Sequence, residues 1–115
     1  MKVSGHTRTE VLCLHDPKAV SEDAFQRLVI AAATQNGWLA YHTHDSRRSQ
    51  AGFPDLVLVH QQHGVLYAEL KSEKGKVSPA QQHWMLSLSL AGQPAFVWKP
   101  SDWSIVCDIL KGEAK

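Results

Sequence analysis

The feature that most constrains the fold is an uninterrupted apolar run over residues 56–59, placed directly after Asp55. Successive residues of a strand point to opposite faces of a sheet, so a strand that is apolar throughout must be covered on both faces. A second strand is expected over residues 65–71, after a short turn around Gln62. The pair predicts an antiparallel hairpin at the centre of a sheet.

A helix is expected on each side of this hairpin along the chain. Ser21 is a preferred N-cap residue, acidic residues follow it, and Gly37 is placed to end the helix. The apolar stripe of this helix consists of Phe25, Leu28, Val29 and Ala32. Ser78 and Pro79 are typical of the cap and first position of a second helix, which ends near Gly92. The stripe of the second helix consists of Gln81, Trp84, Met85 and Leu88.

The remaining segments complete an α/β fold. Strands are expected over residues 38–43 and 95–98, and a final helix from Ser101 or Asp102 to residue 109. The order α-β-β-β-α-β-α predicts a mixed central sheet with helices on both faces.

The chain is expected to form one domain with short extensions. Residues 1–20 show no sustained period and contain Pro17, so we expect an N-terminal arm there, a domain over residues 21–110 and a polar tail over 111–115. A length of 115 residues suits one compact domain. No apolar run approaches the roughly 20 residues of a membrane-spanning helix, so we expect a cytoplasmic protein with no membrane partner.

Three charged residues of the hairpin are expected to converge. Asp55 and Glu69 each lie seven positions from Gln62, so they face each other with Cβ atoms about 4.5–5.5 Å apart. Strand alternation puts Lys71 on the face of Glu69. Two close carboxylates repel unless a cation or a shared proton relieves them, and oxygen ligands suit Mg²⁺ or Mn²⁺.

Such a site predicts metal-assisted phosphodiester hydrolysis. The ion would offset charge developing on the phosphate and activate a water molecule, which Lys71 would orient. For these three residues taken alone, a surface salt bridge of Lys71 with Glu69 or Asp55 is an equally good interpretation.

The neighbours of these residues form a motif. Gly52-Phe53-Pro54-Asp55 followed by Ala68-Glu69-Leu70-Lys71 resembles the signature of the PD-(D/E)XK nuclease superfamily, whose fold is restriction-endonuclease-like. Within it, the chain resembles the VRR-NUC family of small stand-alone nucleases over residues 21–103. The likeness includes residues 42–49, Ser78-Pro79-Ala80-Gln81-Gln82 and Trp98-Lys99-Pro100-Ser101-Asp102-Trp103.

The resemblance assigns roles to individual residues. It implies three metal ligands, namely Asp55, Glu69 and the main-chain carbonyl of Leu70. Lys71 then positions the attacking water. Glu22 resembles a first-helix acid that joins such sites, although an acid there also suits the helix dipole. Gln81, a polar residue on an apolar stripe, resembles the helix glutamine beside the site, and Trp84 is expected in the core rather than as a base-stacking platform.

Basic and hydroxyl side chains flank the expected site. The formal net charge is only +1, so a nucleic acid must be bound by local groups. The predicted phosphate contacts are Ser46, Arg47, Arg48, Lys74 and Lys76. Solvated charged loops are the alternative interpretation of the same residues.

The resemblance implies a Mg²⁺- or Mn²⁺-dependent DNA endonuclease that acts as a homodimer on branched DNA such as Holliday junctions. A catalytically silent nucleic-acid-binding module of the same fold is the alternative, against which the intact Asp55 and Lys71 argue. A metal-binding protein built on His42 and His44 is a further alternative, which the scatter of the seven histidines does not favour.

Overall fold

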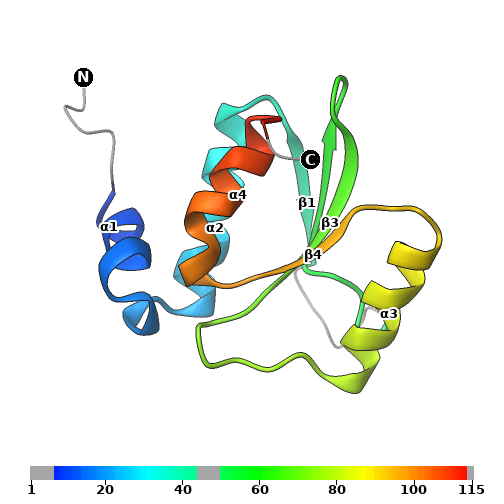
Figure 1. Ribbon diagram of the computed structural model, residues 1–115, viewed down its shortest axis with the longest axis horizontal. Helices are drawn as coiled ribbons and strands as arrows, with labels where there is room; N and C mark the ends of the chain where they lie inside the picture. The colour runs from blue at the N-terminus through cyan, green and yellow to red at the C-terminus, as the bar shows by residue number, and fades with distance from the viewer. Residues whose placement is uncertain (1–6, 44–49, 114–115) are drawn as a thin grey trace.

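A four-stranded mixed sheet separates two groups of helices in the computed structural model, which describes residues 7–43 and 50–113 (Figure 1). In spatial order the strands are β1 (Leu39–His42), β2 (Leu56–His60), β3 (Gly64–Leu70) and β4 (Ala95–Trp98). β1, β2 and β3 are antiparallel neighbours, and β4 runs parallel to β3.

The helices cover both faces of this sheet, as the sequence predicts. α2 (Glu22–Gln35) and α4 (Trp103–Leu110) lie on one side, and α3 (Pro79–Leu90) lies on the other (Figure 1). α3 connects β3 to β4, which explains how two neighbouring strands come to be parallel. No helix among the described residues is long and apolar enough to cross a membrane.

The register of the β2–β3 hairpin is the one expected for a turn centred on Gln62. Leu56 pairs with Ala68, and His60 pairs with Gly64. Both Leu56 and Ala68 are fully buried on the face covered by α2 and α4. Because strand side chains alternate, the residues just before Leu56 and just after Ala68 point to the opposite face, toward α3.

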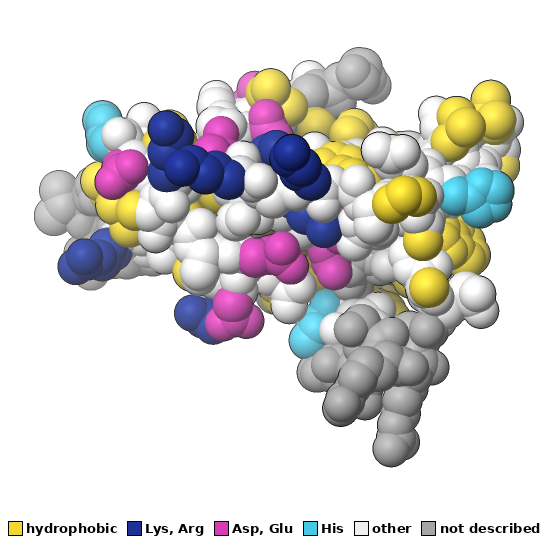
Figure 2. Space-filling model, turned by 90° about the horizontal axis from the view of Figure 1, so that it is seen from below, with side chains coloured by type: hydrophobic (Ala, Val, Ile, Leu, Met, Phe, Trp, Pro, Cys, Tyr) yellow, Lys and Arg dark blue, Asp and Glu magenta, His cyan; other side chains and the backbone are white. Residues whose placement is uncertain are grey.

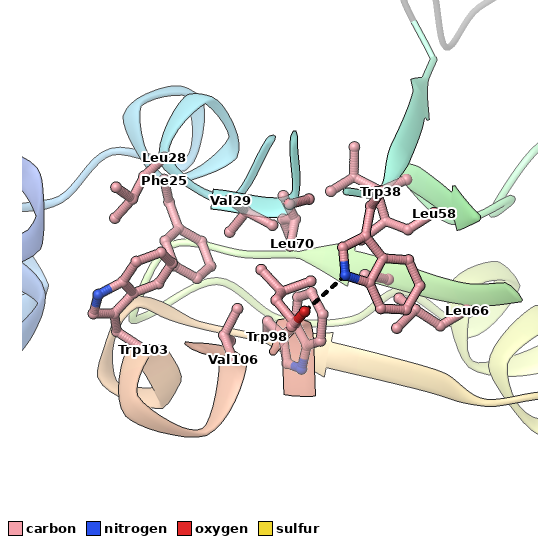
Figure 3. Packing of buried hydrophobic residues seen from close by; sticks show 14 of the residues in the cluster. Phe25, Leu28, Val29, Trp38, Leu58, Leu66, Leu70, Trp98, Trp103 and Val106 are labelled. Carbon is pink, nitrogen blue, oxygen red and sulfur yellow. Dashed lines mark hydrogen bonds between the residues drawn. The ribbon is translucent and has the colours of Figure 1, made fainter. Parts of the chain in front are cut away.

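The hydrophobic core lies between the sheet and helices α2 and α4 (Figure 3). The ring of Phe25 packs edge-on against Trp103, with 6.5 Å between ring centroids. The indole N–H of Trp38 donates to the carbonyl of Leu110 at 2.8 Å, so the polar atom of this buried tryptophan is satisfied. The strands contribute Leu56, Leu58, Leu66, Ala68, Leu70 and Trp98 to this core.

The ends of α2 form where the capping residues predict them, whereas the start of α4 differs from the prediction. Ser21 caps α2 by accepting from the backbone N–H of Ala24 at 3.0 Å. Gly37, with φ of +87°, follows the end of α2 in the left-handed conformation that glycine tolerates. At the last helix, a short 3₁₀ turn, Pro100–Asp102, precedes α4, and Asp102 makes no side-chain cap to it.

Residues 7–20 form helices, which corrects the expectation of an irregular arm. The elements are α1 (Arg8–His15) and a 3₁₀ turn (Pro17–Ala19). Cys13 and Val20 are buried, and α1 packs against α2 and α4. α1 begins with a capping box between Thr7 and Glu10, a short-range signal that is visible in the sequence.

Candidate active site

Asp55 and Glu69 meet at the open end of the β2–β3 hairpin. Asp55 directly precedes β2, and its Oδ2 accepts a hydrogen bond of 2.8 Å from the backbone N–H of Leu70. This bond ties Asp55 to the strand position next to Glu69. The side chain of Glu69 is only 2% exposed. The expected convergence of the two carboxylates is therefore present.

The two carboxylate oxygens of Glu69 have different surroundings. Oε2 accepts a hydrogen bond of 2.8 Å from the Nε2 of Gln81 and lies 3.7 Å from the Nζ of Lys71. Oε1 is buried and has no hydrogen-bond donor among the residues that the structure describes. A buried carboxylate oxygen without a partner is costly, so this atom is suited to a proton or a cation.

The electrostatics of the site agree with that geometry. Burial, followed by the nearby charge of Asp55, raises the pKa of Glu69 to about 8, against the opposing effect of Lys71. Glu22 is exposed, yet partial desolvation of its carboxylate and then the charge of Asp55 also raise its pKa, while Lys71 lowers it. Glu22, in the first turn of α2, thus interacts with the same acid and the same lysine.

The donor set suits a hard divalent cation. The candidate ligands are Asp55, Glu69 and the main-chain carbonyl of Leu70, with Glu22 close enough to add charge. Within residues 7–43 and 50–113, no three His, Cys, Asp or Glu side chains gather into a metal cluster. Any ion would therefore depend on two carboxylates with main-chain or solvent oxygens, which is a common arrangement for Mg²⁺.

Gln81 joins the helix N-terminus of α3 to the carboxylate of Glu69. Its Oε1 accepts from the backbone N–H of Ser78 at 2.8 Å, completing a capping box, while its Nε2 donates to Glu69. Both ends of the amide are used, so its orientation is determined. The structure places Gln81 next to the site, where the sequence predicted it.

α3 also holds the segment that leads into Asp55, a feature that the sequence analysis missed. The indole N–H of Trp84 donates to the carbonyl of Ala51 at 3.1 Å, and the ring of Phe53 packs perpendicular to Trp84 at 5.0 Å. A Cβ on Gly52 would lie 2.5 Å from the backbone of Ala80, so only glycine permits this approach. A glycine just before Phe53 and the following proline was the available signal.

Trp84 is less deeply buried than the sequence predicts. The sequence places it in the core, but in the structure it is half-buried, outside the buried cluster, and borders a hollow on the α3 side. The four predicted stripe residues are the half-buried ones of α3, yet the helix has no fully buried residue. Its contact with the sheet is therefore looser than that of α2.

Not all predicted phosphate contacts can be placed. Lys74 and Lys76 are exposed in the loop after β3, at the same end of the sheet as Glu69. Figure 2 shows acidic and basic side chains side by side in the middle of the face seen from below. Ser46, Arg47 and Arg48 lie outside the described residues, as does His44 of the alternative histidine site.

Most of the chain, from α1 to the beginning of the turn before α4, resembles known proteins. The model of the VRR-NUC domain family matches residues 7–101. A solved VRR-NUC domain is 22% identical with a TM-score of 0.66, and the match covers 84% of this chain and 100% of that one. A second structure, of a VRR-NUC domain protein, is 22% identical with a TM-score of 0.61, over 78% of this chain and 85% of that one. No curated protein matches significantly. The two structures show the same fold, and because the family model spans most of the sequence, the chain belongs to the VRR-NUC domain family.

Proposed function

We propose that this nuclease-type domain is a Mg²⁺- or Mn²⁺-dependent endonuclease that hydrolyses phosphodiester bonds of DNA. The observation that carries the proposal is the buried carboxylate of Glu69, which lies beside Asp55 and leaves Oε1 without a donor among the described residues. Such an arrangement is unfavourable for folding alone, and it is favourable when a cation is bound.

The residues of the site divide the work of hydrolysis. A bound divalent ion would offset charge developing on the phosphate and lower the pKa of a water molecule. Lys71, 3.7 Å from Glu69, supplies a positive charge and a donor that orients the water attacking phosphorus. Gln81 keeps Glu69 in one orientation, and the backbone of Leu70 does the same for Asp55. The P–O bond to the leaving oxygen breaks, and that oxygen takes up a proton from solvent.

The alternative of a catalytically silent module is less well supported. A binding module needs surface charge but no buried acid pair. Here Asp55, Glu69 and Lys71 are all present, and Gln81 and Leu70 hold the two acids in place. This supporting layer is typical of sites that do chemistry.

We also propose that the enzyme acts as a homodimer on branched DNA such as Holliday junctions. A four-way junction needs two matching cuts, and a two-fold dimer supplies two identical sites. β1 is an edge strand whose Leu39 is 74% exposed and whose Tyr41 is 62% exposed. Apolar side chains so exposed on an edge strand are typical of an interaction surface.

The test is cleavage of matched linear, flapped and four-way-junction DNA by the purified protein with Mg²⁺, Mn²⁺ or EDTA. Asp55→Asn and Lys71→Ala should remove cleavage, while Lys111→Ala, an exposed lysine after α4, should retain it. Comparable thermal unfolding of all four proteins would exclude misfolding. Wild-type protein that binds DNA but cuts none of these substrates with either metal would support the silent module instead.

Sedimentation of wild type and Tyr41→Glu tests the dimer separately. The proposed interface predicts a dimer that the charged substitution converts to a monomer. A monomeric wild-type protein that still cuts junctions would contradict the dimer and leave the nuclease proposal in place.

A further inference from the structure

A hollow on the exposed side of α3 takes no part in the proposed hydrolysis. It has a volume of about 670 Å³ and is lined by Gln50, His83, Trp84 and Ser87. We call it the α3 groove. Three of its side chains are exposed and Trp84 is half-buried, so the lining is accessible to a ligand from solvent.

Trp84, which lines the α3 groove, is related to the active site in two ways. Gln81, which donates to Glu69, precedes Trp84 by three residues on the same helix, a separation of about 5 Å along its axis. The indole N–H of Trp84 also donates to Ala51, in the segment that leads to Asp55. A nucleotide next to a phosphate held at the acids could therefore reach the groove.

The lining has the chemistry that a nucleobase needs. Trp84 is held by its hydrogen bond to Ala51 and by the perpendicular ring of Phe53, 5.0 Å away, so its π-surface is presented in a fixed orientation. His83 adds a second ring. Gln50 and Ser87 carry an amide and a hydroxyl that can donate to or accept from the edge of a base. Stacking on aromatic rings tolerates any base sequence.

We propose that the α3 groove binds an unpaired nucleobase of the substrate, next to the phosphate that is cleaved. The proposal rests on the proposed nuclease function. A base inside a duplex is already stacked and paired, so it enters such a groove only after it is extruded, whereas an unpaired base at a flap is free to enter. A preference for flapped DNA would then arise within one subunit, separately from any effect of a dimer on four-way junctions.

The experiment compares a substitution that fills the groove with one that does not. Ser87→Phe places a ring in the groove, and Ser89→Phe places the same ring on an exposed position of α3 that does not line it. Each protein is assayed with Mn²⁺ on two flapped DNAs, one intact and one abasic at the unpaired nucleotide next to the scissile phosphate. A linear duplex is the common reference.

For wild type and Ser89→Phe we expect the abasic flap to be cut about tenfold more slowly than the intact flap. For Ser87→Phe we expect both flaps to be cut at the same reduced rate, because the base no longer has a binding site. Equal slowing of both flaps with the tenfold difference preserved would mean that Ser87→Phe acts on the fold alone, and would overturn the proposal. A changed oligomeric state in Ser87→Phe with unchanged base dependence would mark the groove as a protein contact and overturn it too.

A binding assay separates this proposal from the nuclease proposal. Asp55→Asn protein in EDTA is titrated with flapped DNA carrying 2-aminopurine at the unpaired position. Stacking in the groove should quench the fluorescence, and the added Ser87→Phe substitution should abolish the quenching. Quenching without any cleavage by wild type would contradict the proposed nuclease function and support base binding in the α3 groove. Cleavage without quenching would support the nuclease function and contradict base binding in the groove.

Discussion

The two faces of the central sheet differ in how completely their helices seal them. On the α2 and α4 face, Phe25, Leu56 and Leu58 are fully buried. On the α3 face, the helix has no buried residue, and the polar side chains of Glu69 and Lys71 lie at and just after the end of β3. We call the side covered by α2 and α4 the dry face and the side covered by α3 the open face. The dry face supplies stability through apolar burial, and the open face leaves room for a substrate. Substitutions on the open face should therefore lower DNA cleavage more than stability, and substitutions on the dry face should lower stability more than cleavage.

The largest effect is expected from Glu69→Gln on the open face. An amide cannot supply the anionic oxygen that the proposed site requires, so DNA cleavage should fall by about 10³-fold. The free energy of unfolding in EDTA should change little at pH 7, because a pKa of about 8 leaves Glu69 largely protonated there and the amide replaces a neutral group. Single-turnover cleavage and urea unfolding measure the two quantities. Retention of a tenth of the activity would contradict the assignment of Glu69.

The reverse pattern is expected from Phe25→Ala on the dry face. Loss of a fully buried ring that contacts Trp103 should lower the free energy of unfolding by about 3–5 kcal/mol. Cleavage at a temperature where the variant remains folded should change little. Val11→Ala, at a position 45% exposed on α1, is the control and should leave unfolding nearly unchanged. A loss under 1 kcal/mol for Phe25→Ala would mean that this face is not the main source of stability.

Gln81→Ala sharpens the comparison because Gln81 serves both stability and the site. Removing its amide breaks the capping box with Ser78 and the hydrogen bond to Glu69. We expect the rate of cleavage to fall about 10- to 100-fold and the free energy of unfolding to fall by about 1 kcal/mol. Gln82→Ala, its exposed neighbour on α3, should affect neither measurement. Equal behaviour of the two variants would argue against a positioning role for Gln81.

The smallest effect concerns the pH dependence of the metal-free protein. The pKa of Glu69 rises from 4.5 to about 8 on folding, so between these values the folded state binds more protons than the unfolded state. The free energy of unfolding in EDTA should therefore fall from pH 5 to pH 8. Urea unfolding of Glu69→Gln at both pH values should show a weaker decrease. An identical decrease in both proteins would assign the pH dependence to other groups.

The hairpin shows why part of the site could be predicted without coordinates. The turn at Gln62 and the strand period of two determine which residues face each other, and the observed pairing of Leu56 with Ala68 follows that rule. The relation of Asp55 to Glu69 is thus local, separated by one turn. The capping boxes are equally local. Ser78 and Pro79 predict the start of α3 but not the capping box with Gln81, and α1 has too little apolar periodicity for the box at Thr7 to predict a helix there.

Contacts between distant elements could not be predicted in the same way. The hydrogen bond from Trp84 to Ala51 joins residues 33 positions apart, and the approach of Gly52 to Ala80 depends on where α3 crosses the sheet. The apolar stripe of the helix predicts Trp84 in the core. Periodicity indicates which side of a helix faces inward but not how deeply that side is buried. How deeply the residues of α3 are buried against the sheet follows only from the tertiary structure.

By itself, the sequence determined the order of the elements, the register of the hairpin and the meeting of Asp55, Glu69 and Lys71 at one end of it. These follow from short-range rules of strand alternation, capping and turn formation. Only the tertiary structure decided which atom of Gln81 contacts Glu69, that Trp84 hydrogen-bonds to Ala51, and that α3 leaves a groove lined by Trp84. The physical reason is that burial and electrostatic coupling depend on how whole elements pack. No local pattern of residues determines how far apart two packed elements lie.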